Sequence, residues 1–311
     1  MCAGAGGQAL GLEQAGFRHD GLVEIESSFC ETLKFNRPKW NVINQDLKTL
    51  DGTPYKGIDL LAGGLPCPPF SIAGKQLGKD DERDLFPSAL RLVDEIRPQA
   101  ILIENVRGLL GAPFQDYREH ILNRFKKLGY TAEWRLLNAS DYGVPQLRPR
   151  AILVGIKRNV SEFFEWPEPK SIKALTVGET LLDLMAAKSW KGANAWHLKA
   201  NQIAPTVVGG SKKHGGPDLG PTRAKQAWAE LGVDGMGIAD DCPEKNFKGF
   251  PRLTVPMVAR LQGFPDDWTI RGRKTVAYRQ VGNAFPPPVA RAVAEKIGKC
   301  FSATRSVLLA G

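Results

Sequence analysis

The sequence lacks the features that mark membrane, secreted and zinc-binding proteins. It contains no run of about 18 apolar residues, which excludes a membrane span, and its first residues do not form a basic-then-apolar signal. The five cysteines are scattered, without a Cys-x-x-Cys pair or the spacing of metal ligands. These absences favour a protein of the reducing cytoplasm that holds no metal.

The composition indicates a polyanionic partner. The net charge of +9 and the isoelectric point near 9.3 suit binding to nucleic acid. With 311 residues, of which 42% are hydrophobic, the chain is long enough for a full core and a second, smaller lobe.

A cysteine between prolines is the first candidate for chemistry. Pro66-Cys67-Pro68-Pro69 follows a strand-like run over residues 57–62. Proline fixes its own φ and restricts the residue before it, so a thiol at this place points in one direction. A lone cysteine is more often a small buried hydrophobe. Cys67 therefore becomes a candidate nucleophile only if other segments support it.

Two further strands carry polar residues at their ends. The apolar run over 101–106 predicts a buried parallel strand that ends at Glu104. Because ligands collect at the carboxyl ends of strands in open α/β sheets, we expect Cys67 and Glu104 to share one edge. Arg148 and Arg150 precede the apolar strand 151–155 and should point to the same side. A solvated face is an equally good reading of these two arginines taken alone.

The start of the chain suggests a nucleotide-like cofactor. The turn Ala3-Gly4-Ala5-Gly6-Gly7 leads into a helix, and Glu24, twenty residues after Gly4, could bind ribose hydroxyls. This signal is weak and is shared with dinucleotide enzymes. Near the other end, a glycine turn at 282–284 precedes a helix that begins with prolines and carries Val289, Val293 and Ile297 on one stripe.

These segments, in this order, resemble those of the DNA cytosine-5 methyltransferases, and the resemblance covers nearly the whole chain. Each short motif could occur by chance, whereas the complete series is specific. The matching motifs are Pro66-Cys67, Glu104-Asn105-Val106, Gln146 with Arg148 and Arg150, Arg260-Leu261-Gln262-Gly263-Phe264-Pro265, and Gly282-Asn283.

The resemblance implies an α/β fold of the S-adenosylmethionine-dependent methyltransferase type. Its sheet is Rossmann-like, mostly parallel and doubly wound, with helices on both faces. Residues 1–170 and 280–311 would form the catalytic and cofactor-binding domain. Residues 171–279, which are rich in loops, would form a small target-recognition lobe.

The implied reaction is transfer of a methyl group to C5 of cytosine in a specific double-stranded DNA sequence, through a covalent bond between Cys67 and C6 of a flipped-out base. Glu104 would sit against N3 and the exocyclic amine, and Arg150, with Arg148 beside it, would hold O2 or a phosphate. The residues expected to bind the substrate are Ser71, Asn105, Gln146, Thr206, Lys212, Lys213 and Gln262.

The implied cofactor is S-adenosyl-L-methionine. The residues expected to bind it are Ala3, Gly4, Gly6, Gly7, Glu24, Ile25, Asp46, Leu47, Leu85, Asn283 and Ala284. The resemblance is to the modification enzymes of bacterial restriction systems. We therefore expect a cytoplasmic monomer that acts on double-stranded DNA beside a restriction endonuclease, with no membrane and no metal as partners.

One departure from the family pattern leaves alternatives open. Only Met1, Cys2 and Ala3 precede Gly4, so we expect the first strand of the sheet to be missing and its neighbours, the 101–104 strand and the Val23 strand, to be exposed. A truncated, inactive DNA-binding remnant is therefore one alternative. Methylation of cytosine in tRNA by the same chemistry is another.

Overall fold

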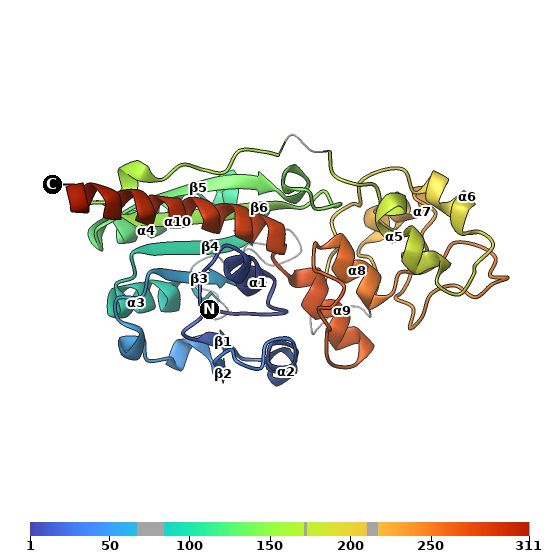
Figure 1. Cartoon of the computed structure of the whole chain (residues 1–311), viewed down its shortest axis with the longest axis horizontal. Coiled ribbons are helices and arrows are strands. Elements are labelled where there is room, and N and C mark those ends of the chain that lie inside the picture. The colour runs from blue at the N-terminus through green and yellow to red at the C-terminus, as the bar shows by residue number, and fades with distance from the viewer. Residues whose placement is uncertain (67–83, 171–172, 210–216, 311) are drawn as a thin grey trace.

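The computed structural model describes residues 1–66, 84–170, 173–209 and 217–310, with side chains up to residue 303. A twisted sheet with helices on both faces forms one part of the molecule, and a helical lobe built from residues of the later half of the chain extends from one end of it (Figure 1). No helix in the described ranges is both long and apolar enough to cross a membrane.

The main sheet has four strands in the order β3–β4–β6–β5. Its strands are β3 (Leu60–Gly64), β4 (Ala100–Val106), β5 (Tyr130–Asn138) and β6 (Pro149–Lys157). The β3 and β4 strands are parallel, whereas β6 runs antiparallel to both β4 and β5. The α/β class is confirmed, and the antiparallel end of the sheet is a detail that apolar runs alone do not predict.

Both faces of the main sheet are covered because its central strand is apolar on both sides. Ile101 and Ile103 pack in one core with helices α3 (Phe86–Ile96) and α4 (Gln115–Lys127). The alternate residue Leu102 packs in a second core with α1 (Gly7–Gln14) and α10 (Pro287–Ala310). Successive strand residues point to opposite faces, so a continuous apolar run is what a doubly covered strand requires.

A smaller parallel sheet lies beside β3. It consists of β1 (Leu22–Glu24) and β2 (Val42–Asn44), joined by α2 (Ser27–Asn36). The first residues of the chain run between the two sheets: the Met1 amino group donates to the Ala62 carbonyl at 2.7 Å, and the Ala3 amide donates to the Val23 carbonyl at 3.0 Å. The first residues thus touch both sheets without pairing them fully.

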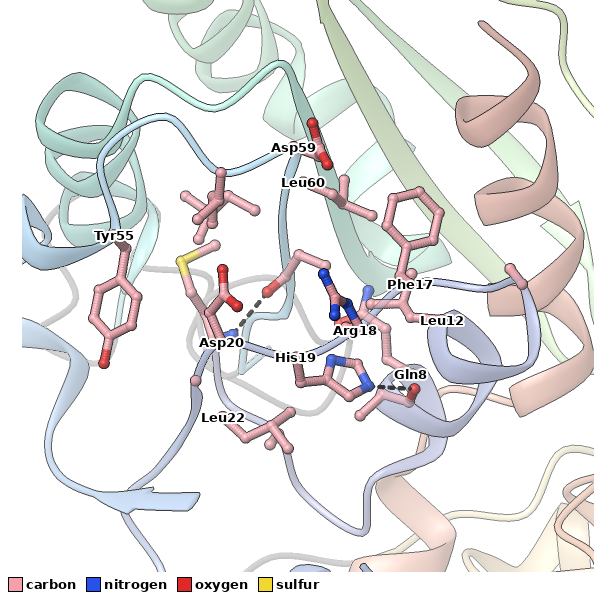
Figure 2. A pocket seen from close by; sticks show the side chains of 18 of the residues that line it. Gln8, Leu12, Phe17, Arg18, His19, Asp20, Leu22, Tyr55, Asp59 and Leu60 are labelled. Atoms are coloured by element: carbon pink, nitrogen blue, oxygen red, sulfur yellow. Dashed lines mark hydrogen bonds between the residues drawn. The ribbon is translucent and has the colours of Figure 1, made fainter. Parts of the chain in front are cut away.

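This arrangement corrects one expectation. The 101–104 strand does not lose a neighbour, because β4 is flanked by β3 and β6 along its length. The strands that face each other across the first residues are β1 and β3. A cavity of about 550 Å³ lies between them (Figure 2), with Leu22, Tyr55 and Leu60 among its lining residues.

The helical lobe consists of helices and long loops. Its helices are α5 (Val177–Ala186), α6 (Ala193–Lys199), α7 (Thr222–Glu230), α8 (Val255–Leu261) and α9 (Lys274–Asn283). Trp196 and Trp228 lie in its core, and this core also includes Ala5 and Leu10 from the start of the chain. The predicted boundary at 279–280 falls inside α9, so the two predicted domains share this helix.

Short 3-10 helices connect several of these elements. They are Leu47–Thr49, Thr53–Tyr55, Arg107–Leu110, Ala112–Phe114, Ala139–Tyr142 and Ser161–Phe163.

Gly282 lies in the last turn of α9 and not in a turn between elements, which corrects the prediction for residues 282–284. Its lack of a side chain serves packing instead: a Cβ built on Gly282 would lie 2.3 Å from the Cα of Gly209.

Candidate active site

The carboxyl ends of β3 and β4 meet at one corner of the main sheet. Gly64 is the register partner of Glu104, and the Leu65 amide donates to the Glu104 carbonyl at 3.3 Å. A Cβ on Gly64 would lie 3.2 Å from Oε2 of Glu104, so the carboxylate stands directly beside the strand exit. The chain reaches Pro66 within two residues of this point. Cys67 comes next and lies outside the described residues.

Glu104 is ion-paired with Arg150. The Arg150 Nε lies 2.7 Å from the Glu104 Oε1, and both side chains are about one-tenth exposed (11% and 10%). Their strands are antiparallel, with Val106 opposite Arg150, so the two side chains are diagonal neighbours on one face. Burial raises the pKa of Glu104, and the positive charges of Arg150 and Arg148 oppose that rise. The corner therefore holds a carboxyl group that is easier to protonate than an ordinary glutamate.

Asn105 lies behind this corner. Its side chain is 1% exposed, donates to the Leu65 carbonyl at 3.4 Å and accepts from the Val106 amide at 2.8 Å. These contacts hold the exit of β3 against the end of β4. The sequence predicts Asn105 as a substrate contact, whereas the geometry assigns it a supporting role.

Arg148 is fully buried and points to a different set of partners. Its guanidinium donates to the carbonyls of Val207 at 2.7 Å, Gly282 at 2.8 Å and Ala284 at 3.0 Å. Burial lowers the pKa of Arg148, and the neighbouring charge of Arg150 adds to this effect. The two arginines, expected to point to the same side, thus have different partners: Arg150 contacts the carboxylate at the corner, and Arg148 contacts these carbonyls.

Gln146 and Gln262 are also fully buried. The Gln146 Nε2 donates to the Gln262 Oε1 at 3.0 Å, and its Oε1 accepts from the Val207 amide at 2.9 Å. Thr206 is half-buried and its hydroxyl donates to the Leu147 carbonyl. The two glutamines are predicted as substrate contacts, yet their amides are turned inward to other protein groups.

The glycine turn forms an open backbone surface beside a buried carboxylate. Gly4 and Gly6 have positive φ values of 55° and 86°, which a side chain would disfavour. The Glu24 carboxylate accepts from the amides of Gly4 at 2.7 Å and Glu26 at 2.9 Å and is 6% exposed. A Cβ on Gly4 would meet no atom of the described residues within 4 Å, so none of the described residues fills the space above the turn.

The other residues predicted to bind the cofactor near the start of the chain lie on three further segments. Ile25 follows Glu24 and is 60% exposed, which offers an apolar surface beside the free space. The Asp46 side chain accepts from the Lys48 amide at 2.9 Å and so begins the 3-10 helix at Leu47, whose own side chain is buried. Leu85 immediately precedes α3 and is partly buried. A carboxylate, an exposed apolar side chain and an open backbone fit an adenosine group.

The C-terminal segment lies against the same turn. Asn283 is exposed and Ala284 is buried. A Cβ on Gly7 would lie 2.2 Å from the carbonyl oxygen of Phe285, so only glycine permits this contact.

One supporting residue escaped the sequence reasoning. The Trp268 Nε1 donates to the Ala5 carbonyl at 3.0 Å, and a Cβ on Gly6 would lie 2.8 Å from the Trp268 ring. A buried tryptophan far along the chain therefore fixes the shape of the turn. Its only signal in the sequence is its place three residues after Pro265, in a segment that carries a family motif.

Four of the predicted site residues lie outside the part of the chain that the structure describes. They are Cys67, Ser71, Lys212 and Lys213.

The comparisons decide the family. The family described as C-5 cytosine-specific DNA methylase matches residues 1–299. The chain belongs to this family. Its activity is therefore methyl transfer to C5 of cytosine in DNA. Members of the family use S-adenosylmethionine as the methyl donor, which the residues around the glycine turn can accommodate.

Two curated relatives are similar along nearly the whole chain. The type II methyltransferase M.NgoMIV of Neisseria gonorrhoeae is 58% identical over 97% of this chain and 96% of its own length. The type II methyltransferase M.NaeI of Lentzea aerocolonigenes is also 58% identical, over 96% of this chain and 73% of its own. Among solved structures, Spodoptera frugiperda DNMT2 gives a TM-score of 0.64 at 18% identity, over 96% of this chain and 98% of its own, which supports the fold.

Proposed function

We propose that this enzyme methylates one specific double-stranded DNA sequence as the modification enzyme of a type II restriction system, with S-adenosylmethionine as donor. The observation that carries this proposal is the buried ion pair between Glu104 and Arg150 beside the end of β3. Only Leu65 separates the last residue of that strand from Pro66-Cys67. The 58% identity to two type II methyltransferases supports the biological context.

In the proposed reaction, the thiolate of Cys67 adds to C6 of the cytosine ring and so raises the electron density at C5. Glu104 faces N3 and the exocyclic amine. Its raised pKa makes this carboxyl easier to protonate than that of an ordinary glutamate, and in the protonated form it would donate a hydrogen bond to N3 as charge builds up there. Arg150 holds the carboxyl in place and presents its remaining N–H groups to the O2 atom of the base.

When bound, the cofactor would supply an electrophilic methyl group to C5 and leave as S-adenosylhomocysteine. Loss of the C5 proton to a base, with elimination of the Cys67 thiolate from C6, would then restore the ring and free the enzyme. For this chain we assign its adenosine part to the space above Gly4, with the Glu24 carboxylate toward the ribose hydroxyls and Ile25 against the adenine. We also assign Asp46, Leu47 and Asn283 to this site, the first two from the 3-10 helix that Asp46 caps and the third from the last turn of α9.

DNA would lie between the sheet and the recognition lobe, because the target base must leave the stack to reach Glu104.

Lys212 and Lys213 are proposed to bind phosphates. Reversing both charges should weaken DNA binding and reduce the slope of log K against log salt by roughly one unit for each phosphate that is no longer neutralised. Affinity for S-adenosylhomocysteine should stay the same, and an unchanged slope would assign these lysines to a solvated turn.

We also propose that the enzyme acts as a monomer in the cytoplasm, where its DNA substrate is located, beside an endonuclease of the same specificity. This part of the proposal rests on the type II designation of the two relatives.

The decisive test concerns Cys67. The Cys67→Ala variant should lose methyl transfer but keep its melting temperature and DNA affinity, because only the covalent step is removed. A duplex with 5-fluorocytosine at the target should form an adduct that survives denaturation with the parent but not with the variant.

A tritiated-methyl assay with duplex DNA, tRNA or no nucleic acid separates the alternatives. Transfer to tRNA alone would favour the tRNA enzyme. No transfer at all would favour the inactive remnant, and appreciable turnover by the Cys67→Ala variant would reject Cys67 as nucleophile.

A further inference from the structure

A buried polar cluster joins the recognition lobe to the segment beside the cofactor space. Its centre is Arg148, whose Nη1 donates to the Val207 carbonyl at 2.7 Å, while Nη2 donates to the carbonyls of Gly282 at 2.8 Å and Ala284 at 3.0 Å. Val207 leads into the recognition region, whereas residues 282–284 end α9 beside the glycine turn. One side chain thus binds both segments.

Two glutamines complete the cluster. Gln146 accepts from the Val207 amide at 2.9 Å and donates to the Gln262 side chain at 3.0 Å. Gln262 in turn donates to the Val281 carbonyl at 2.8 Å. All three polar side chains of the cluster are 0% exposed. Buried networks of this kind hold one geometry, because any displacement leaves a polar group without a partner.

The two joined segments also touch directly. A Cβ on Gly209 would lie 2.5 Å from the Asn283 Oδ1 and 2.7 Å from the Asn283 amide nitrogen. The Tyr278 hydroxyl donates to the Val208 carbonyl at 2.9 Å. Because the backbones are in contact, residues 207–209 cannot shift toward α9 without displacing its last turn.

We propose that Arg148 is a positioning residue that couples the recognition region to the cofactor site, so that DNA bound on one side favours cofactor bound on the other. This inference rests on the proposed function, since it takes residues 171–279 as the DNA-binding lobe and residues 282–284 as part of the cofactor site. Arginine suits the role because its planar fork can bind carbonyls from two segments at once. Coupling between two binding sites is reciprocal, so each ligand should increase the affinity for the other by the same factor.

The test measures that factor. The affinity for S-adenosylhomocysteine is determined by calorimetry with and without a duplex that carries the sequence methylated in the expression host. In the parent, we expect the duplex to increase the affinity for S-adenosylhomocysteine by about tenfold, within the usual range for coupled sites. The ratio of the affinity measured with the duplex to the affinity measured without it should be close to one in Arg148→Met, while each ligand alone still binds. Arg148→Lys, which keeps the charge but not the fork, should restore part of the ratio.

A matched control separates coupling from a loss of stability. The Arg118 Nη1 donates to the carbonyls of Leu109 and Gly111, both at 2.7 Å, but these groups belong to neither segment. Arg118→Met should therefore lower the melting temperature and leave the ratio unchanged. Gly209→Ala tests the same contact from the recognition side, in case Arg148→Met does not fold. Its added methyl group must displace Asn283, and we expect the ratio to fall.

The outcomes are distinct. A parent that fails to bind S-adenosylhomocysteine or the duplex would reject the proposed function. A parent that binds both ligands with a ratio of one would reject the coupling alone. A ratio that survives in both Arg148→Met and Gly209→Ala would also reject it and leave Arg148 as an ordinary buried contact.

Discussion

The two edges of β3 are built very differently. On one side, β3 pairs with β4 over five consecutive residues, and Gly64 brings the backbone against Glu104. On the other side, within the described residues, it receives a hydrogen bond from the Met1 amino group and packs against Met1 at Gly63, and a cavity of about 550 Å³ lies beside it (Figure 2). The corner at Glu104 is therefore fixed by the ladder between β3 and β4, whereas the glycine turn depends on contacts from distant segments such as Trp268.

Because the two edges of β3 differ in this way, changes at one edge should affect the reaction and changes at the other should affect stability. Changes at the β3–β4 edge should affect turnover strongly and folding little, because the backbone ladder persists without the Glu104 carboxylate. Changes at the open edge should affect folding and cofactor affinity, because the backbone and apolar side chains there border a cavity.

The largest expected effect is at the packed edge. Glu104→Gln should lower the single-turnover rate of methyl transfer by about 10²–10⁴-fold, the usual contribution of a positioned acid or base. The amide keeps the shape and one hydrogen-bond donor but cannot exchange a proton with N3. The melting temperature, measured beside the rate, should stay near that of the parent. A rate within threefold of the parent would remove Glu104 from the reaction.

Much of this corner could be predicted from the sequence. The apolar run before Glu104, the extended Arg148–Arg150 segment and the glycines of the first turn each leave a local pattern, because strand burial and positive φ constrain residue type directly. The order of these patterns also indicated the family. The glycine that follows α4, Gly129, likewise has a positive φ of 92°.

The rest depends on contacts between distant residues. The inward orientation of Gln146 and Gln262 follows from backbone groups at Val207 and Val281, which no local pattern connects to them. The neighbour of the first residues is β3 and not β4, because strand order is set by how the layers pack and not by which run is most apolar. Trp268 was missed for the same reason: its partner, Ala5, lies at the other end of the chain.

A smaller effect is expected at the open edge. Burial lowers the pKa of the Met1 amino group, so a positive charge there is unfavourable. Fusing about eight residues of an apolar strand ahead of Met1 would replace that charge with an amide and fill part of the cavity. We expect the melting temperature to rise by roughly 4 °C, as about 2 kcal/mol would produce in a chain of this size, and S-adenosylhomocysteine to bind more tightly.

A Gly/Ser extension of equal length is the matched control for this prediction. It also removes the terminal charge but offers no apolar side chains. If the two extended proteins and the parent have the same melting temperature, an added strand does not stabilise the open edge. If both extensions raise the melting temperature equally, removal of the charge accounts for the gain and the cavity does not.

The smallest expected effect returns to the packed edge and concerns pH. Burial raises the pKa of Glu104, so between its ordinary value of about 4.3 and the raised value the folded protein keeps a proton that the unfolded chain has lost. The free energy of unfolding therefore falls as the pH rises through this window. Glu104→Gln does not titrate and escapes that loss. The melting temperature of the variant minus that of the parent should increase as the pH is raised from about 4, and should level off above the folded pKa. All other groups titrate alike in the two proteins, so the difference isolates this carboxyl. A difference that falls with rising pH would mean that the ion pair with Arg150 outweighs burial, and the corner would then hold an ordinary ionised carboxylate.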